Sequence, residues 1–299
     1  MSDFFLKLQR SVITFLLSFG LVFSAFGVGV VGVVFLFRTQ PTTEPVVFPQ
    51  PFTLADDAII APAAIVYDLT DGTILFAKNA EAPMPLASLT KLMTAYVVLE
   101  HTATNTLVTI TPRDVALAGE WGLRSGDTMP LRDLLKLGLV ASSNDAMAAA
   151  AHSVGDSYVA QMNSTAARLG LSKTYFLNPT GLDVNQETAG GYGSAYDMAR
   201  LAGAFFTEHP EYFSFTTQKS VSITEGDRVV TSLATAAPML DIPGFLGAKT
   251  GYTRLSQGNL VAIFDIEIGH PVAVVVLGST ELGRFTDVRT LINHIRRPL

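Results

Sequence analysis

The 299-residue sequence contains no cysteine, which excludes a disulfide framework, a thiolate nucleophile and any cysteine-ligated metal site. Its five histidines lack metal-ligand spacing such as His-Glu-x-x-His, so we expect neither a metallopeptidase nor any cofactor. Charged residues make up only 15% of the chain, against roughly 25% in typical domains. The net charge of −6 argues against a nucleic-acid binder, which usually carries a basic stripe. The low charge and the 48% hydrophobic content point to one strongly apolar segment.

That segment comprises residues 12–37, which carry no charge and follow Lys7 and Arg10. At about 1.5 Å of helical rise per residue, it is long enough to cross the ~30 Å hydrocarbon core of a bilayer. The basic residues before it favour a cytoplasmic N-terminus, residues 1–11. We therefore expect a single-pass anchor in the cell membrane with the rest of the chain on the extracytoplasmic side. A cleaved secretory signal is the alternative, because small residues around Ala25 would permit cleavage.

A proline-rich stretch, residues 38–58, follows the apolar segment. Four prolines among threonine, glutamine and glutamate favour an extended linker over packed structure. The remaining residues, 59–299, suit one large α/β domain.

Hydrophobic patterns in residues 59–299 predict a five-stranded sheet flanked by helices, with a mainly helical insert. Two apolar runs separated by Asp71-Gly72 predict an opening hairpin. Three further strand-like runs lie near the C-terminus and can pair antiparallel with the hairpin. The expected strands are residues 63–67, 73–77, 245–250, 259–266 and 272–277, and the expected helices are residues 89–100, 131–139, 145–152 and a final one from 285 to 295.

Ser88 and Lys91 begin the first of these expected helices. Residues three apart share a helical face, so the Lys91 amine can reach the Ser88 hydroxyl. A serine becomes a nucleophile when a base takes its proton, and a lysine can do so if burial and cationic neighbours lower its pKa. Taken alone, the pair is more typical of a serine in a capping position followed by a surface lysine.

Two further motifs follow in order: Ser142-Ser143-Asn144 in a break between helices, and Lys249-Thr250-Gly251 in a strand-like run. Each is also compatible with an ordinary cap or an ordinary strand lysine. Together, Ser-x-x-Lys, Ser-x-Asn and Lys-Thr-Gly form the signature of penicillin-binding proteins and serine β-lactamases.

The sequence resembles the D-alanyl-D-alanine carboxypeptidases among the low-molecular-mass penicillin-binding proteins. The likeness extends over about residues 59–297 and includes Pro85 to Thr94, Gly126-Asp127-Thr128, Asn178-Pro179-Thr180-Gly181-Leu182 and Gly247 to Thr253. It implies a β-lactamase/transpeptidase-like fold, in agreement with the expected sheet. It also implies two partners, a peptidoglycan stem peptide as substrate and β-lactam antibiotics as covalent inhibitors.

By this resemblance, Ser88 is the nucleophile, Lys91 takes its proton, and Ser142 and Asn144 orient the lysine and return the proton. The resemblance also implies that backbone N–H groups of Ser88 and Tyr252 form the oxyanion hole. The residues implied to bind substrate, among them those that hold its C-terminal carboxylate, are Lys249, Thr250, Gly251, Tyr252 and Arg284, with Arg254 as an alternative to Arg284.

Two features depart from better-known relatives. Thr180 stands where many relatives carry histidine. The chain also ends soon after the last expected helix, where some relatives have a second β domain and an amphipathic anchor, so we expect the N-terminal segment to replace that anchor.

The sequence motifs leave three alternatives to a carboxypeptidase open. A peptidoglycan DD-endopeptidase would use the same groups with a different groove. A class A β-lactamase would need a glutamate-activated water, and no Glu-x-x-Leu-Asn segment lies between the second and third motifs. A non-enzymatic, penicillin-recognising wall-binding module would not need Ser88, Lys91 and Lys249 intact.

Overall fold

The computed structural model describes residues 51–296 except 56, 117–121, 226–227, 236, 238 and 240. Within these residues, no helix has the length and apolarity needed to span a bilayer. The predicted cytoplasmic N-terminus and membrane segment, residues 1–11 and 12–37, lie outside the described part of the chain, as does most of the predicted linker.

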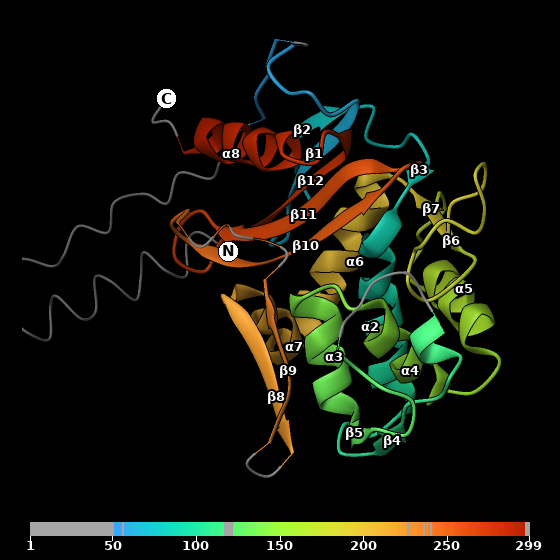
Figure 1. Ribbon diagram of the computed structural model, residues 1–299. Coiled ribbons are helices and arrows are strands. Elements are labelled where there is room, and N and C mark those ends of the chain that lie inside the picture. Colours follow the sequence, from blue (N-terminus) through green and yellow to red (C-terminus); the bar gives the residue numbers. More distant parts are fainter. Residues whose placement is uncertain are drawn as a thin grey trace, which may run out of the picture. The chain divides into compact units, whose positions relative to one another are not determined.

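An antiparallel sheet of five strands in the order β10-β11-β12-β1-β2 organises the domain (Figure 1). This confirms the predicted sheet, including the pairing of the C-terminal strands with the opening hairpin. The strands are rich in β-branched and small apolar residues, which pack well on a pleated surface. Their bounds are Ala63–Asp68 for β1, Ile74–Lys78 for β2, Phe245–Thr253 for β10, Gln257–Asp265 for β11 and Pro271–Ser279 for β12.

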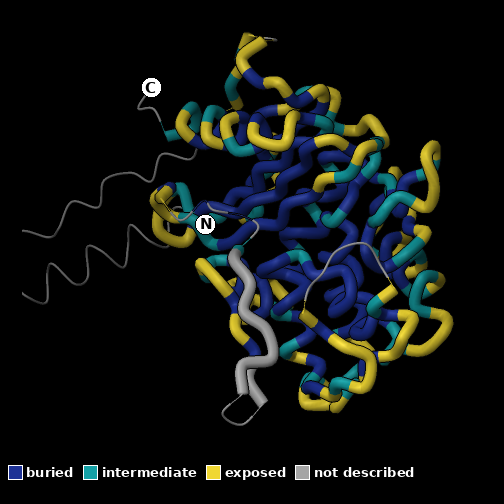
Figure 2. The backbone as a smooth tube through the Cα atoms, viewed as in Figure 1, coloured by how far each residue is buried: buried dark blue, intermediate teal, exposed yellow. Residues whose placement is uncertain are grey.

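Alternate residues of the central strands enter two separate hydrophobic clusters, because successive side chains of a strand point to opposite faces. On β12, Val274 and Val276 pack toward helix α8 (Gly283–Ile295), whereas Val275 and Leu277 pack toward the helical part of the domain. The predicted final helix is thus confirmed as a cover for one face of the sheet, and helix α6 (Ala195–Glu208) covers the other. Figure 2 shows the central strands as buried along most of their length.

Part of the predicted linker belongs to the folded unit. The Phe52 N–H donates to the Leu75 carbonyl oxygen at 2.9 Å, and its ring stacks on Phe76 with centroids 5.3 Å apart. Leu54 joins the cluster beneath α8. Proline content predicted extended chain here, and the phenylalanine and leucine side chains that follow the last of these prolines explain why this part nevertheless packs.

The middle of the chain is mainly helical, as predicted, and its helices surround the buried helix α2 (Thr90–His101). Three small β structures within it were not predicted. The strands of two of them have only two or three residues, too few to show a period, whereas the third is a hairpin of six- and seven-residue strands that the sequence analysis missed. The other helices are α3 (Leu131–Val140), α4 (Asn144–His152), α5 (Tyr158–Arg168) and α7 (Pro210–Ser214). The small β structures are a sheet of β3 (Met84–Pro85), β6 (Tyr175–Phe176) and β7 (Gly191–Gly193), a pair of β4 (Leu107–Thr109) and β5 (Thr128–Pro130), and a hairpin of β8 (Ser220–Glu225) and β9 (Arg228–Ala234).

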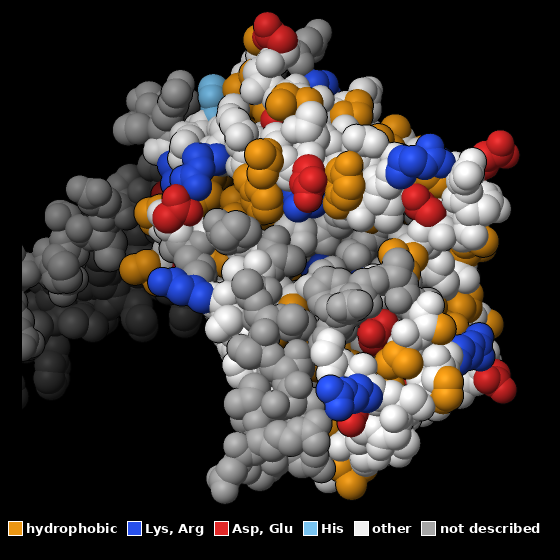
Figure 3. Space-filling view, viewed as in Figure 1, with side chains coloured by type: hydrophobic (Ala, Val, Ile, Leu, Met, Phe, Trp, Pro, Cys, Tyr) orange, Lys and Arg blue, Asp and Glu red, His pale blue; other side chains and the backbone are white. Residues whose placement is uncertain are grey.

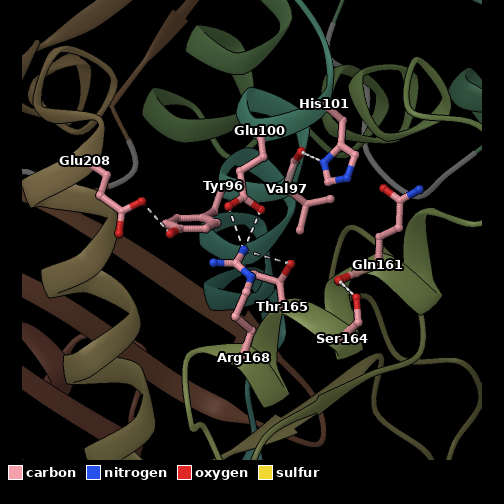
Figure 4. A network of polar contacts seen from close by, with 9 residues as sticks. All are labelled: Tyr96, Val97, Glu100, His101, Gln161, Ser164, Thr165, Arg168 and Glu208. Atoms are coloured by element: carbon pink, nitrogen blue, oxygen red, sulfur yellow. Dashed lines mark hydrogen bonds and ion pairs between the residues drawn. The ribbon is translucent and has the colours of Figure 1, made fainter.

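Polar contacts tie the C-terminal half of α2 to the two helices beside it (Figure 4). The Tyr96 hydroxyl donates to Glu208 of α6 at 2.6 Å, and Arg168 of α5 donates to both carboxylate oxygens of Glu100 at 2.6 and 2.7 Å. Burial, followed by the hydrogen bond to Glu208, raises the pKa of Tyr96 to about 12, so its hydroxyl keeps its proton. These contacts fix the helix whose first turn carries Lys91.

Candidate active site

Ser88 lies in a single 3-10 turn, η1 (Ala87–Leu89), immediately before α2. The sequence predicted a helix start here, and the structure places the serine one turn earlier, with Ala87 in the left-handed region at φ 47°. Ser88 is partly exposed, while its neighbours Ala87 and Leu89 are buried. The turn therefore presents the hydroxyl at the surface of an otherwise closed core.

Lys91 is fully buried, and its amine contacts three oxygen atoms. Its Nζ lies 2.7 Å from Ser88 Oγ, 2.8 Å from Asn144 Oδ1 and 2.8 Å from the Thr180 carbonyl oxygen. The last two atoms can only accept hydrogen bonds. A neutral amine donates its two hydrogens to them and keeps its lone pair for the third direction, which is that of the serine hydroxyl.

Burial lowers the pKa of Lys91 well below its usual value, and the charge of Lys249 lowers it further. The amine contacts a hydroxyl, an amide and a carbonyl oxygen, none of which carries a negative charge. The site thus favours the unprotonated amine, which is the form that can accept a proton.

Ser142 and Asn144 lie where α3 gives way to α4, as the sequence predicted. Ser142 adopts a left-handed conformation with φ 62°, which turns the chain sharply. Ser143 caps α4 by accepting a hydrogen bond from the Ala146 N–H at 3.2 Å. Asn144 is the first residue of that helix, and this cap places its amide oxygen on Lys91.

Lys249 reaches the same site from strand β10. Its Nζ donates to Ser142 Oγ at 2.8 Å and to the Thr250 carbonyl oxygen at 2.9 Å. Burial, with the charge of Arg284 as a second cause, lowers the pKa of Lys249 to about 7. The structure therefore brings the three motifs, which are far apart in sequence, into one cluster.

The other predicted substrate-binding residues lie along the same strand or beside it. Thr250 and Gly251 are buried, Tyr252 is about half exposed, and Arg284 donates from Nη1 to the Gly251 carbonyl oxygen at 2.8 Å. Arg284 is 7% exposed, and its Nε has no hydrogen-bond partner among the described residues. Arg254, the alternative, contacts the Gln186 carbonyl oxygen in an exposed loop.

The carbonyl oxygen of Thr180 is a site group that the sequence reasoning did not identify. It accepts from Lys91, and the loop that carries it is shaped by Asn178, whose Oδ1 accepts from the Gly181 N–H at 2.7 Å. Gly181 has φ 78°, and a Cβ there would lie 1.8 Å from the Ala87 carbonyl oxygen. The Asn-Pro-x-Gly pattern signals such a turn, but a backbone carbonyl leaves no mark in the sequence that assigns it to a lysine.

A pocket of about 640 Å³ adjoins this cluster. Thr180 and Tyr252 line it on the side of the motifs, and Arg113, His152 and Asp183 line it farther away. Its walls are mixed in charge. On the face of the molecule in Figure 3, basic and acidic side chains of the described residues are likewise interspersed, without a basic stripe.

Comparisons with known proteins point to one family. A family model described as D-alanyl-D-alanine carboxypeptidase matches residues 50–281. D-alanyl-D-alanine carboxypeptidase DacD of Salmonella typhimurium is 33% identical over 266 residues, covering 82% of this chain and 63% of the relative. The match thus spans less than two thirds of that relative's length.

Solved structures with the same fold include a D-alanyl-D-alanine carboxypeptidase from Mycobacterium tuberculosis, at TM-score 0.73 and 26% identity, covering 83% of this chain and 97% of that one. Penicillin-binding protein D2 from Listeria monocytogenes, solved in an ampicillin-bound form, is 29% identical at TM-score 0.70, covering 83% and 100% of the two chains. The β-lactamase/transpeptidase-like fold expected from the sequence is confirmed by these structural neighbours.

Proposed function

Because the chain belongs to the D-alanyl-D-alanine carboxypeptidase family, we propose that it removes the terminal D-alanine from peptidoglycan stem pentapeptides through an acyl-enzyme on Ser88. The observation that carries this proposal is the 2.7 Å contact between Ser88 Oγ and the buried Lys91 Nζ. A wall-binding module without enzymatic activity would have no use for a desolvated amine held against a serine hydroxyl.

In the first step, the Ser88 hydroxyl donates its proton to the neutral Lys91 amine as Oγ attacks the carbonyl carbon of the D-Ala-D-Ala bond. Asn144 Oδ1 and the Thr180 carbonyl oxygen accept the two other N–H groups, so the lone pair stays aimed at Oγ. Removing such a base usually costs a factor of about 10² to 10⁴ in rate.

The tetrahedral intermediate then collapses. Its oxyanion accepts hydrogen bonds from the backbone N–H groups of Ser88 and Tyr252, a pair of donors in which each is worth about 3 to 4 kcal/mol. The proton held by Lys91 then passes through the hydroxyl of Ser142, which lies beside Lys249, to the leaving amine, and D-alanine departs. Water hydrolyses the Ser88 ester and restores the hydroxyl.

The free carboxylate of the substrate requires fixed positive charge and hydroxyl donors. Lys249 and Thr250 supply these from β10. We propose that Arg284 adds a further positive charge beside them, because it is buried and hydrogen-bonded to the Gly251 carbonyl oxygen. A carboxylate brought to this site would favour the charged form of Lys249.

We propose two further partners, β-lactam antibiotics and the cell membrane. β-Lactam antibiotics would acylate Ser88, and the similar penicillin-binding protein D2 was solved in an ampicillin-bound form. The apolar residues 12–37 would hold the domain at the extracytoplasmic face of the cell membrane.

The test is D-alanine release from a pentapeptide ending in D-Ala-D-Ala, measured on the full chain in detergent with the Ser88→Ala variant as control. Release by the parent that is lost in the variant supports the proposal. No release from folded parent protein contradicts it.

Two further substrates separate the alternatives. Cleavage of cross-linked peptide dimers in preference to the pentapeptide would identify an endopeptidase. Rapid turnover of penicillin, instead of a stable acyl-enzyme detected by mass, would identify a β-lactamase.

A further inference from the structure

Asn259 is a fully buried asparagine of β11 that none of the sequence motifs includes. In the antiparallel pair of β10 and β11 it lies directly opposite Gly251, next to the Tyr252 amide. Buried amides need partners for both ends of the side chain, since an unmet hydrogen-bonding group costs about 1 to 3 kcal/mol.

The oxygen of this amide accepts a hydrogen bond from a backbone group at an irregularity in the sheet. The pairing of β11 with β12 shifts register between Gly258 and Leu260, so Asn259 has no strand partner there. Its Oδ1 accepts a hydrogen bond from the Gly278 N–H at 2.8 Å. The side chain thereby replaces a backbone contact that the bulge removes.

The donor end reaches out of the sheet to the nucleophile turn. Asn259 Nδ2 donates to the Pro85 carbonyl oxygen at 2.8 Å, three residues before Ser88. The turn and the strand are already in tight contact. A Cβ on Gly251 would lie 2.8 Å from the Leu86 carbonyl oxygen and 3.2 Å from the Ser88 nitrogen.

We propose that Asn259 is a positioning residue that sets the separation between the Ser88 turn and strand β10, and hence between the two oxyanion-hole amides. One side chain is bonded to β12, sits opposite Gly251 and holds the segment leading into Ser88. Each donor of an oxyanion hole must lie about 2.7 to 3.1 Å from the oxygen on which negative charge develops. A small change in the separation of the two amides therefore lengthens these hydrogen bonds and stabilises the transition state less, with a smaller effect on the bound ground state. This inference rests on the proposed function only in assuming that Ser88 is acylated.

The experiment measures single-turnover acylation of the full chain by a fluorescent penicillin, which gives the acylation rate constant and the preceding noncovalent affinity separately. The variants are Asn259→Ala, which removes both contacts, and Asn259→Asp, which keeps the acceptor and loses the donor. Asn163→Ala is the matched control, because Asn163 also bridges two elements by bonding the Phe176 N–H and carbonyl, but far from Ser88 in the chain.

We expect both Asn259 variants to acylate about 10- to 100-fold more slowly per folded molecule, with affinity within about twofold of the parent. The control should acylate at the parental rate even if it melts at a lower temperature. In Asn259→Asp, the rate relative to the parent should recover as the pH falls from about 7 to 5, because a protonated carboxyl can donate again.

Parental acylation rates in folded Asn259 variants, or a loss of affinity at an unchanged rate, would overturn the inference. Failure of both variants to fold would also overturn it, by making Asn259 a residue of folding instead of positioning. Acylation without D-alanine release from the pentapeptide would contradict the proposed function alone, and a parent that is not acylated would contradict both.

Discussion

At the scale of single residues, Lys91 shows why a buried amine that lowers stability can be retained. Its amine is desolvated, lies in the field of the cation Lys249 and contacts only neutral oxygens. Each of these features disfavours the ammonium. The same features make the amine a base for Ser88, so the energetic cost and the chemistry have one origin.

Replacing Lys91 should abolish the chemistry while leaving the fold intact. Lys91→Met keeps the approximate volume without a base, so we expect penicillin acylation to fall by about 10² to 10⁴. The measurement is the single-turnover rate with fluorescent penicillin. A variant that is acylated within threefold of the parent would show that another group takes the proton.

The same substitution has a consequence for stability. Because the pKa of Lys91 is lowered in the fold, the unfolded chain binds more protons between that pKa and about 10.4, and stability rises with pH over this window. Denaturant titrations at pH 7 and 10 should therefore show the parent gaining stability relative to Lys91→Met. An equal change in both proteins would contradict the burial of an uncharged amine.

Lys249 should set the alkaline limit of activity. Its pKa of about 7 means that its positive charge is lost as the pH rises through neutrality, which weakens the hold on the substrate carboxylate. We expect kcat/KM for the pentapeptide to decline above about pH 7. In Lys249→Arg the guanidinium stays charged, so the decline should move to higher pH. A decline at the same pH in both proteins would assign it to another group.

At the scale of elements, the loop 178–182 shows how a backbone turn serves the site. It delivers the Thr180 carbonyl oxygen to Lys91 and passes so close to η1 that only glycine fits at position 181. From the sequence, the side chain of Thr180 was singled out as a departure from better-known relatives, but that side chain is not what Lys91 contacts. The contact with Lys91 is made by the main chain, which every residue supplies.

Gly181→Ala should be far more disruptive than the same change at a matched glycine. Gly181 and Gly269 have φ of 78° and 79°, but only Gly181 has a neighbour within 4 Å of an added Cβ. Gly269→Ala therefore costs only backbone strain, about 1 to 2 kcal/mol. We expect Gly181→Ala to lose several kcal/mol more and to slow acylation. Thermal unfolding of the two variants checks this, and equal melting temperatures would refute it.

The helices and strands that the sequence predicted well are those with a long apolar run or a clear hydrophobic period. β1, β11 and β12 are apolar runs buried on both faces, and α8 has one apolar stripe that packs on the sheet. The η1 turn was missed because Ala87 takes a left-handed conformation that alanine rarely adopts. This turn packs closely against Gly181, a tertiary contact that no local pattern reveals.

At the scale of the whole molecule, the sequence could predict which residues share a site but not how they are joined. Ser88, Lys91, Asn144 and Lys249 were named from motif order alone. The contact of Asn259 with Pro85 joins residues 174 apart in sequence and has no local pattern. The packing of Phe52 on Phe76 was not predicted either, because the proline content of residues 38–58 favours extended chain and gives no sign of a contact with the sheet.

The placement of the domain relative to a membrane is the largest prediction that the sequence makes. Residues 12–37 are uncharged and long enough to span a bilayer, so we expect the full chain to resist extraction by carbonate and to keep its N-terminus. The checks are fractionation of cells expressing the chain and the intact mass of the membrane-bound protein.

A shortened chain beginning at residue 39 without a signal supplies the control and should appear in the soluble fraction, because it lacks the apolar residues 12–37. A membrane-free protein whose mass corresponds to cleavage near Ala25 would instead identify a secretory signal. These two outcomes predict different reach. An extended linker rises about 3.1 Å per residue, so an anchored chain would reach only stem peptides within the length of its linker from the membrane. A released chain would not be limited in this way.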